Sequence, residues 1–289
     1  MKPKTSQSIA SVSLIAISLL IASPASAHTT YGGVARNLGP NVETVPGSGV
    51  FNLPGVITGA TAATPYFKTI TNQTVTSDHG WASGTNPEFG DAHHIRAFRF
   101  TLAEAGWATI SVAAAPSRGT ASALGPVPII PAFSLYSGLL STGSADYDTA
   151  LITLAYLQTL GAPQPRAGAL NSLGDWKMGN DASLPDGFGN YDFDELSSLT
   201  YIGNAADGTS ANFGSAVGIN GDGLSDGFVQ SSFTLPAGDY TLIIGGADIS
   251  GSNGLTFGID ASLSVIPEPS STLLIGLSSL GLALHRRRV

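Results

Sequence analysis

Apolar and polar residues alternate most regularly near the C-terminal end of the chain, over residues 255–265. The apolar positions recur at every second residue, and the positions between them are mostly polar or small; the apolar set is Leu255, Phe257, Ile259, Ala261, Leu263 and Val265. This period of two predicts an extended strand with one buried face. Apolar runs with β-forming residues predict two further strands, at Ala132–Leu140 and Ser198–Gly203.

Two other segments, 95–112 and 228–246, share one pattern. Each contains Phe-Thr-Leu, a turn that ends in Ala-Gly, an aromatic residue and an apolar strand with threonine. We expect each to form a hairpin of one β-sandwich. Segment 147–160 fits a short helix, and a buried strand is the alternative. The predicted fold class is therefore mainly β, a jelly-roll-like sandwich with a short helix.

The longest apolar runs, Ser11–Ala22 and Thr272–Leu284, lie at the two ends of the chain, and no run between them reaches 18 residues. This pattern excludes a polytopic membrane protein. The first run follows Lys2 and Lys4 and precedes small residues at the signal-cleavage positions Ala25 and Ala27. Such an order is typical of a secretory signal helix. We expect a signal peptide over residues 1–27, cleaved after Ala27.

The C-terminal end combines a Pro-Glu-Pro tripeptide, an apolar run and a basic cluster. These are Pro267, Glu268 and Pro269, then 273–284, then Arg286, Arg287 and Arg288. As a helix the apolar run would measure about 20 Å, short of a ~30 Å hydrocarbon core. The arginines would stay at the cytoplasmic face. Because the prolines oppose helix, the tripeptide should remain extended and accessible. An ordinary anchor that is never cut is the alternative.

This end resembles the PEP-CTERM sorting signal, a tail also named the ice-binding protein C-terminal domain. The resemblance covers only about the last 23 residues. It implies that exosortase, a membrane-embedded cysteine protease of Gram-negative bacteria, recognises the chain as its substrate. It also implies transient inner-membrane anchoring, then a place at the cell surface or in the extracellular matrix. The expected organisation is a signal peptide (1–27), an exported β-sandwich body (28–264) and a sorting signal ending in a hydrophobic helix (265–289).

Composition narrows what the body can do. The chain has a net charge of −8, and five of its 12 basic residues lie in the two end segments, so the body is more acidic still. Phosphate backbones would repel it, which disfavours nucleic-acid partners. Without cysteine there are no disulfides and no thiolate metal sites. No Gly-x-Ser-x-Gly elbow occurs, and paired acids such as Asp192 and Asp194 do not by themselves make a glycosidase.

Two acidic, glycine-rich loops carry oxygen ligands that could suit calcium. Their candidate ligands are Asp186, Asn190, Asp192, Asp194, Asp222 and Asp226. The alternative is solvated turn chemistry, for which Asp, Asn and Gly are common. A second cluster has carboxylates and imidazoles that could bind zinc: Asp78, His79, Glu88, Asp91, His93 and His94. If extended, His93 and His94 would point to opposite sides, which favours ordinary loop histidines.

Exposed aromatic residues could stack on sugar rings. Trp81 and Trp176 lie in loops rich in Gly, Asp and Ser, so we expect them to be exposed, whereas Trp107 opens a strand and should pack in the core. The sequence as a whole predicts an exported, non-enzymatic surface protein sorted by exosortase. The alternatives are a carbohydrate-binding module of the exopolysaccharide matrix and a secreted hydrolase. Ice binding is weaker, because no regular Thr-x-Thr ladder is present.

Overall fold

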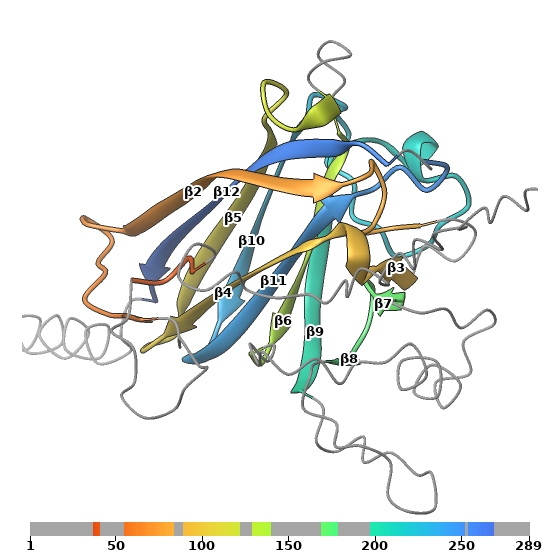
Figure 1. Cartoon of the computed structure of the whole chain (residues 1–289). Helices are drawn as coiled ribbons and strands as arrows, with labels where there is room; N and C mark the ends of the chain where they lie inside the picture. Colours follow the sequence, from red (N-terminus) through yellow and green to blue (C-terminus); the bar gives the residue numbers. More distant parts are fainter. Residues whose placement is uncertain are drawn as a thin grey trace, which may run out of the picture.

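The computed structural model describes residues 37–40, 55–83, 89–121, 129–139, 169–178, 197–251 and 254–268. Two β-sheets face one another (Figure 1). The six-stranded sheet has the order β1-β4-β11-β6-β9-β8, formed by Val56–Ile57, Arg96–Leu102, Gly238–Gly246, Pro131–Ser137, Ser197–Ala206 and Trp176–Met178. The four-stranded sheet has the order β10-β5-β12-β2, formed by Phe228–Leu235, Gly106–Ala114, Thr256–Pro267 and Tyr66–Thr76.

Alternating apolar residues of both sheets meet in one core. From the four-stranded sheet come Ala108, Ile110 and Val112 of β5 and Ala261, Leu263 and Val265 of β12, all buried. The six-stranded sheet contributes Phe98, Phe100, Phe133, Leu135, Leu242 and Ile244. Burying such side chains on folding is the main stabilising contribution. The prediction of a mainly β sandwich is confirmed.

The two repeated segments do not form hairpins, contrary to expectation. Strands β4 and β5 lie in different sheets, and so do β10 and β11, so each turn carries the chain across the sandwich. Instead β5 pairs antiparallel with β10, and β4 pairs antiparallel with β11. The two segments therefore associate with each other rather than each folding on itself. At the first turn a Cβ on Gly106 would stand 2.8 Å from the Ile266 carbonyl oxygen, so only glycine fits that close approach.

A further layer covers the outside of the six-stranded sheet. It contains the pair β3 (Phe89–Asp91) and β7 (Ala169–Asn171), and the 3₁₀ turn η2 (Ala92–His94); a second turn, η5 (Ser210–Phe213), follows β9. Two apolar clusters form there, one around Trp176 and Tyr136 and one around Trp81 and Phe213. The predicted helix at 147–160, the signal peptide and the C-terminal apolar run lie outside the described residues.

Candidate functional site

The sorting tripeptide begins within the last strand of the sandwich. Strand β12 lies between β5 and β2 and continues through Val265 and Ile266 to Pro267, which pairs with Gly106. The backbone N–H of Glu268 then donates a hydrogen bond to the carbonyl oxygen of Ala105 at 3.1 Å. Pro267 is extended as predicted, and the Glu268 side chain is exposed. Pro269, Arg286, Arg287 and Arg288 lie outside the described residues.

Three large apolar side chains lie on the outer face of the four-stranded sheet, at the end where β12 stops. They are Phe67 of β2 (68% exposed), Trp107 of β5 (53%) and Ile266 of β12 (38%). Ile266 is directly opposite Trp107, and Phe67 is opposite Ser264, one outward position before Ile266. Directly paired side chains on one face are about 5 Å apart and diagonal ones about 7 Å. The three residues form one continuous patch, here called the apolar rim.

Behind the apolar rim, the outer face carries hydroxyl side chains in rows across the strands. One row pairs Ser264 with Thr109 and Thr109 with Ser232, and the next pairs Ser262 with Thr69 and Ser111. The hydroxyls of Thr109 and Ser232 are 2.8 Å apart, as are those of Thr69 and Ser262. The outward positions in the apolar rim and in these two rows are uncharged. Lys68, between Phe67 and Thr69 on β2, faces the other way and donates to the Gly39 carbonyl oxygen at 2.8 Å.

The tryptophans are placed opposite to expectation. Trp81 is fully buried and Trp176 is 2% exposed, whereas Trp107 stands open to solvent. Trp81 is buried because its loop folds over the six-stranded sheet, where its Nε1–H donates to the Ser134 hydroxyl at 2.7 Å. Neither Trp81 nor Trp176 can stack on a sugar in this arrangement. The alternation along β5 would have predicted the exposure of Trp107. Ala108, Ile110 and Val112 take the inward positions of the strand, so Trp107 points outward.

The predicted histidine cluster is assembled in part. Asp91 ends β3 and caps η2, accepting from the His93 backbone N–H at 2.9 Å. Its carboxylate also lies 3.1 Å from His93 Nδ1 and 3.8 Å from His94 Nε2. The ring of His94 meets the ring of His79 edge-on at 4.8 Å between centroids, and His79 Nδ1 is 3.5 Å from Asp78 Oδ1. Both adjacent histidines reach Asp91 because η2 is a turn and not an extended strand.

The described contacts of this cluster join Asp91 to His93 and His94, and Asp78 to His79. Across the described residues no three His, Asp or Glu side chains are arranged to hold a metal ion. Burial raises the pKa of Asp91, but hydrogen bonds from His93 and the nearby charges of His93 and His94 outweigh it, so its pKa lies below the ordinary value of 3.8. The contacts therefore favour ionised Asp91. Glu88 lies outside the described residues.

Of the two candidate calcium loops, the structure describes the one with Asp222 and Asp226, whose carboxylates make local hydrogen bonds to the backbone. Asp222 Oδ1 accepts from the backbone N–H of Gly208 at 3.1 Å and of Leu224 at 3.0 Å, and Asp226 Oδ1 accepts from Phe228 N–H at 3.1 Å. These local hydrogen bonds are those for which Asp is favoured in loops. Asp186, Asn190, Asp192 and Asp194 lie outside the described residues, so calcium there stays a prediction.

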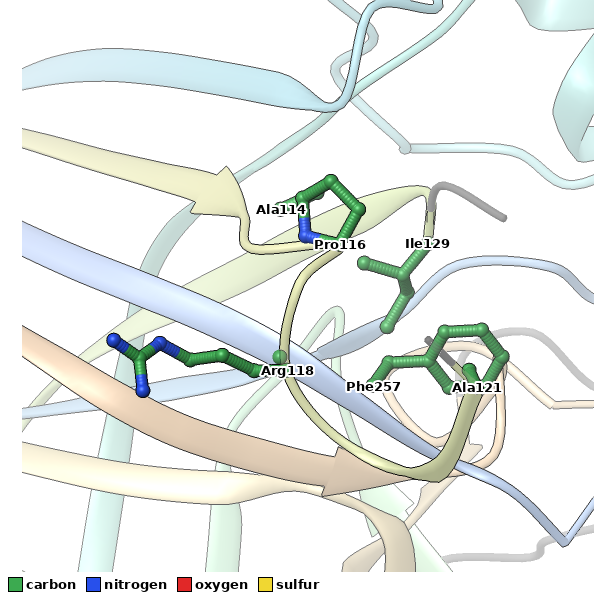
Figure 2. Close-up of a pocket in the computed structure, with 7 residues that line it drawn as sticks. Ala114, Pro116, Arg118, Ala121, Ile129 and Phe257 are labelled. Carbon is green, nitrogen blue, oxygen red and sulfur yellow. The ribbon is translucent and has the colours of Figure 1, made fainter. Parts of the chain in front are cut away.

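A hollow lies where the β5–β6 connection crosses β12. Its lining is mostly small or apolar: Ala114, Pro116, Arg118, Ala121, Ile129, Phe257 and Gly258. The space is about 190 Å³ with its open mouth included, below the ~300 Å³ of small ligand sites. Arg118 is its one charged residue, and Figure 2 shows the guanidinium directed away from the other lining side chains. Among its described lining residues, no set of polar groups converges on the hollow.

Comparison of the chain with known proteins finds distant structural likeness. No curated protein matches the chain. Similar solved structures include CorA, a surface-associated copper-binding protein of Methylomicrobium album BG8, with TM-score 0.42 and 15% identity over 74% of this chain and 100% of that one. Another is MopE, a secreted protein of Methylococcus capsulatus in which an oxidised tryptophan facilitates copper binding, with TM-score 0.36 and 15% identity over 82% and 96%. Likeness this distant assigns no ligand here.

The model of the PEP-CTERM protein-sorting motif matches residues 265–288, which confirms the resemblance seen in the sequence. In the part of the chain that the structure describes, no helix combines the length and the apolarity needed to cross a bilayer. The apolar run of the motif itself lies beyond that part. The chain therefore carries a PEP-CTERM protein-sorting motif at its C-terminal end, and this motif starts in strand β12.

Proposed function

We propose that this chain is an exported, non-enzymatic cell-surface or matrix protein that exosortase processes at Pro267-Glu268-Pro269, with the β-sandwich as its delivered body. The observation that carries this proposal is the motif at 265–288. Its first residues are the end of a core strand, so the chain leaves the sandwich at a fixed point of the surface, at Glu268. The chemistry belongs to exosortase, and this chain supplies the substrate.

The geometry suits a protease that must find a short extended segment. Val265 is buried and locks the strand, while Ile266 and the Glu268 side chain are exposed. Beyond the strand, the backbone N–H of Glu268 donates a hydrogen bond to the Ala105 carbonyl oxygen, and this is where the described part of the tripeptide ends. Such a bond contributes about 0.5–1.5 kcal/mol, so releasing the segment into an active site costs little.

The test is the mass of the mature protein from cells with and without exosortase. We expect the protein from wild-type cells to lack residues 1–27 and the tail after the tripeptide, and the protein from exosortase-deficient cells to keep the tail. Glu268→Gln should also keep the tail. Glu104→Gln is the matched control, because Glu104 is an exposed carboxylate in the neighbouring turn. Removal of the tail without exosortase would refute the proposal.

The carbohydrate-binding alternative loses the two residues on which it rested, since Trp81 and Trp176 are buried. Turnover on a panel of secreted-hydrolase substrates is the separate test of enzymatic activity.

A further inference from the structure

We propose that the apolar rim is a membrane-contact surface. Phe67, Trp107 and Ile266 would enter the headgroup region of the inner membrane and seat the sandwich on the lipid surface while the tail anchors the chain. This inference rests on the proposed function, because it needs the tail to enter that membrane. It adds a lipid-binding site on the folded body, outside the tail itself.

The position of the rim relative to the tail carries the first step. Ile266 belongs to the rim and is two residues before Glu268, where the described chain ends. Only residues 269–272 separate Glu268 from the apolar run that starts at Leu273. An extended chain spans at most about 3.6 Å per residue, so five steps reach at most about 18 Å. Ile266 of the rim lies two residues before Glu268, so it is tethered within ~25 Å of the start of the anchoring segment.

In Figure 1 the arrowhead of β12 and the start of β2 lie together at the left end of the sandwich, away from the covering layer with β3 and β7. The rim faces outward at this end, and its neighbours are uncharged hydroxyls of the same sheet face. An outer face that changes from apolar at the tail end to hydroxyl-rich behind it matches the change from acyl chains to headgroups. Tryptophan is enriched at that level of a bilayer.

The chemistry of the three side chains favours lipid over a polysaccharide or a second copy. Sugar rings stack on aromatic faces, which leaves the exposed Ile266 without a role, whereas lipid accepts aliphatic and aromatic side chains alike. Three side chains also make too small a patch for a stable dimer, which buries about 800 Å² per partner. Near the rim along the chain, the exposed residues Glu104 and Glu268 are acidic, so they offer no attraction to anionic lipid. The contact should therefore be apolar and insensitive to salt.

Tryptophan fluorescence gives a direct test, because Trp107 is the exposed one of the three tryptophans and the tail contains none. The probe is the signal-cleaved chain that keeps its tail, purified from exosortase-deficient cells and reconstituted in phosphatidylcholine vesicles. With lipids brominated near the headgroup, we expect Trp107 emission to be quenched at least about twofold and shifted to the blue, equally at low and high salt. Trp107→Phe should remove the quenchable component and leave the buried tryptophans.

Phe67→Ser should lower the quenching by at least half, because it removes apolar contact beside Ile266 while it leaves the sorting motif intact. Leu224→Ser is the matched control: Leu224 is 60% exposed but lies in the loop before β10, outside the rim, so quenching should not change. Circular dichroism of each variant checks folding. The readout does not use exosortase, so the rim can fail while processing succeeds, and the reverse.

Three outcomes would overturn the inference. Trp107 that stays unquenched while the tail is inserted would show that the rim does not reach lipid. A blue shift of Trp107 emission of the same size on addition of the organism's soluble exopolysaccharide, without vesicles, would mean that the rim binds sugar. A blue shift that depends on protein concentration in the absence of lipid would assign it to a second copy of the chain.

Discussion

The two sheets of the sandwich have outer faces of opposite character. Over the six-stranded sheet, a layer of short strands and turns buries Trp81, Trp176 and Tyr136, and Trp81 Nε1–H and the Tyr136 hydroxyl donate hydrogen bonds there. No described element covers the outer face of the four-stranded sheet, where Trp107 is exposed among hydroxyl side chains. The covered face therefore contributes mainly to stability, and the open face is available for contact.

Tryptophan truncation should separate the two faces most strongly. Trp81→Ala removes a fully buried ring and its hydrogen bond to Ser134, so we expect unfolding free energy to fall by about 3–5 kcal/mol. Trp107→Ala removes an exposed ring and should cost less than about 1 kcal/mol. Urea denaturation of the two variants measures both values. Similar losses in the two variants would mean that the faces do not differ in stability.

The hydrogen-bond relay under the covering layer should matter next. The Ser134 hydroxyl accepts from Trp81 Nε1–H and donates to the Ser172 carbonyl oxygen at 2.5 Å, and the Ser172 hydroxyl donates to the Trp81 carbonyl oxygen. Ser134→Ala leaves a buried indole N–H and a carbonyl without this partner, at a cost of about 1–3 kcal/mol. The control is Ser262→Ala, whose hydroxyl bonds to Thr69 on the open face. An equal loss in Ser262→Ala would contradict the comparison.

The loss of unfolding free energy at acid pH should also depend on a residue of the covered face, Asp91. Because the folded-state pKa of Asp91 lies below 3.8, its ionised form stabilises the fold above that value, and this contribution is lost as pH falls through the lower folded value. Asp91→Asn should thus lower the unfolding free energy at neutral pH by about 1–2 kcal/mol and leave the difference smaller near about pH 3. Thermal melts across this range measure it.

Glu104→Gln, an exposed carboxylate in the turn before β5, is the control for charge removal and should leave the curve unchanged. An Asp91→Asn curve that runs parallel to the wild-type curve down to acid pH would show that the histidine contacts of Asp91 do not stabilise its ionised form.

Local pattern was sufficient for the strands but not for what covers them. The alternation over 255–265 predicted β12, and the same phase extended to Ile266 would have placed it outward with Ser262 and Ser264. The Pro-Glu-Pro end was also readable, because its specificity lies in consecutive residues. Features of this kind depend on a few neighbours along the chain.

Long-range arrangement could not be obtained in this way. A short turn at 103–105 suits a hairpin and a crossing between sheets equally well, so the pairing of β5 with β10 had no local signal. Trp81 lies in a polar loop, and its burial depends on Ser134, 53 residues away. The composition of a loop indicates that its side chains are exposed only when no other segment folds over the loop. The covering layer is formed by segments distant in sequence, so loop composition could not predict it.

The smallest effect should come from the hydroxyl rows of the open face, and it sharpens the comparison most finely. Thr109 and Ser232 share a hydrogen bond of 2.8 Å, but both remain accessible to water, which can replace either partner. Thr109→Val and Ser232→Ala should each change unfolding free energy by no more than about 0.5 kcal/mol, with a coupling energy of similar size in the double-mutant cycle. The same cycle on Trp81→Phe and Ser134→Ala should give a coupling above about 1 kcal/mol, because no water replaces the lost partner there. A coupling energy on the open face as large as that of the buried pair would mean that the hydroxyls of the open face form a network that stabilises the fold. The apolar rim would then be the edge of a rigid surface, not of a surface that contributes little to stability.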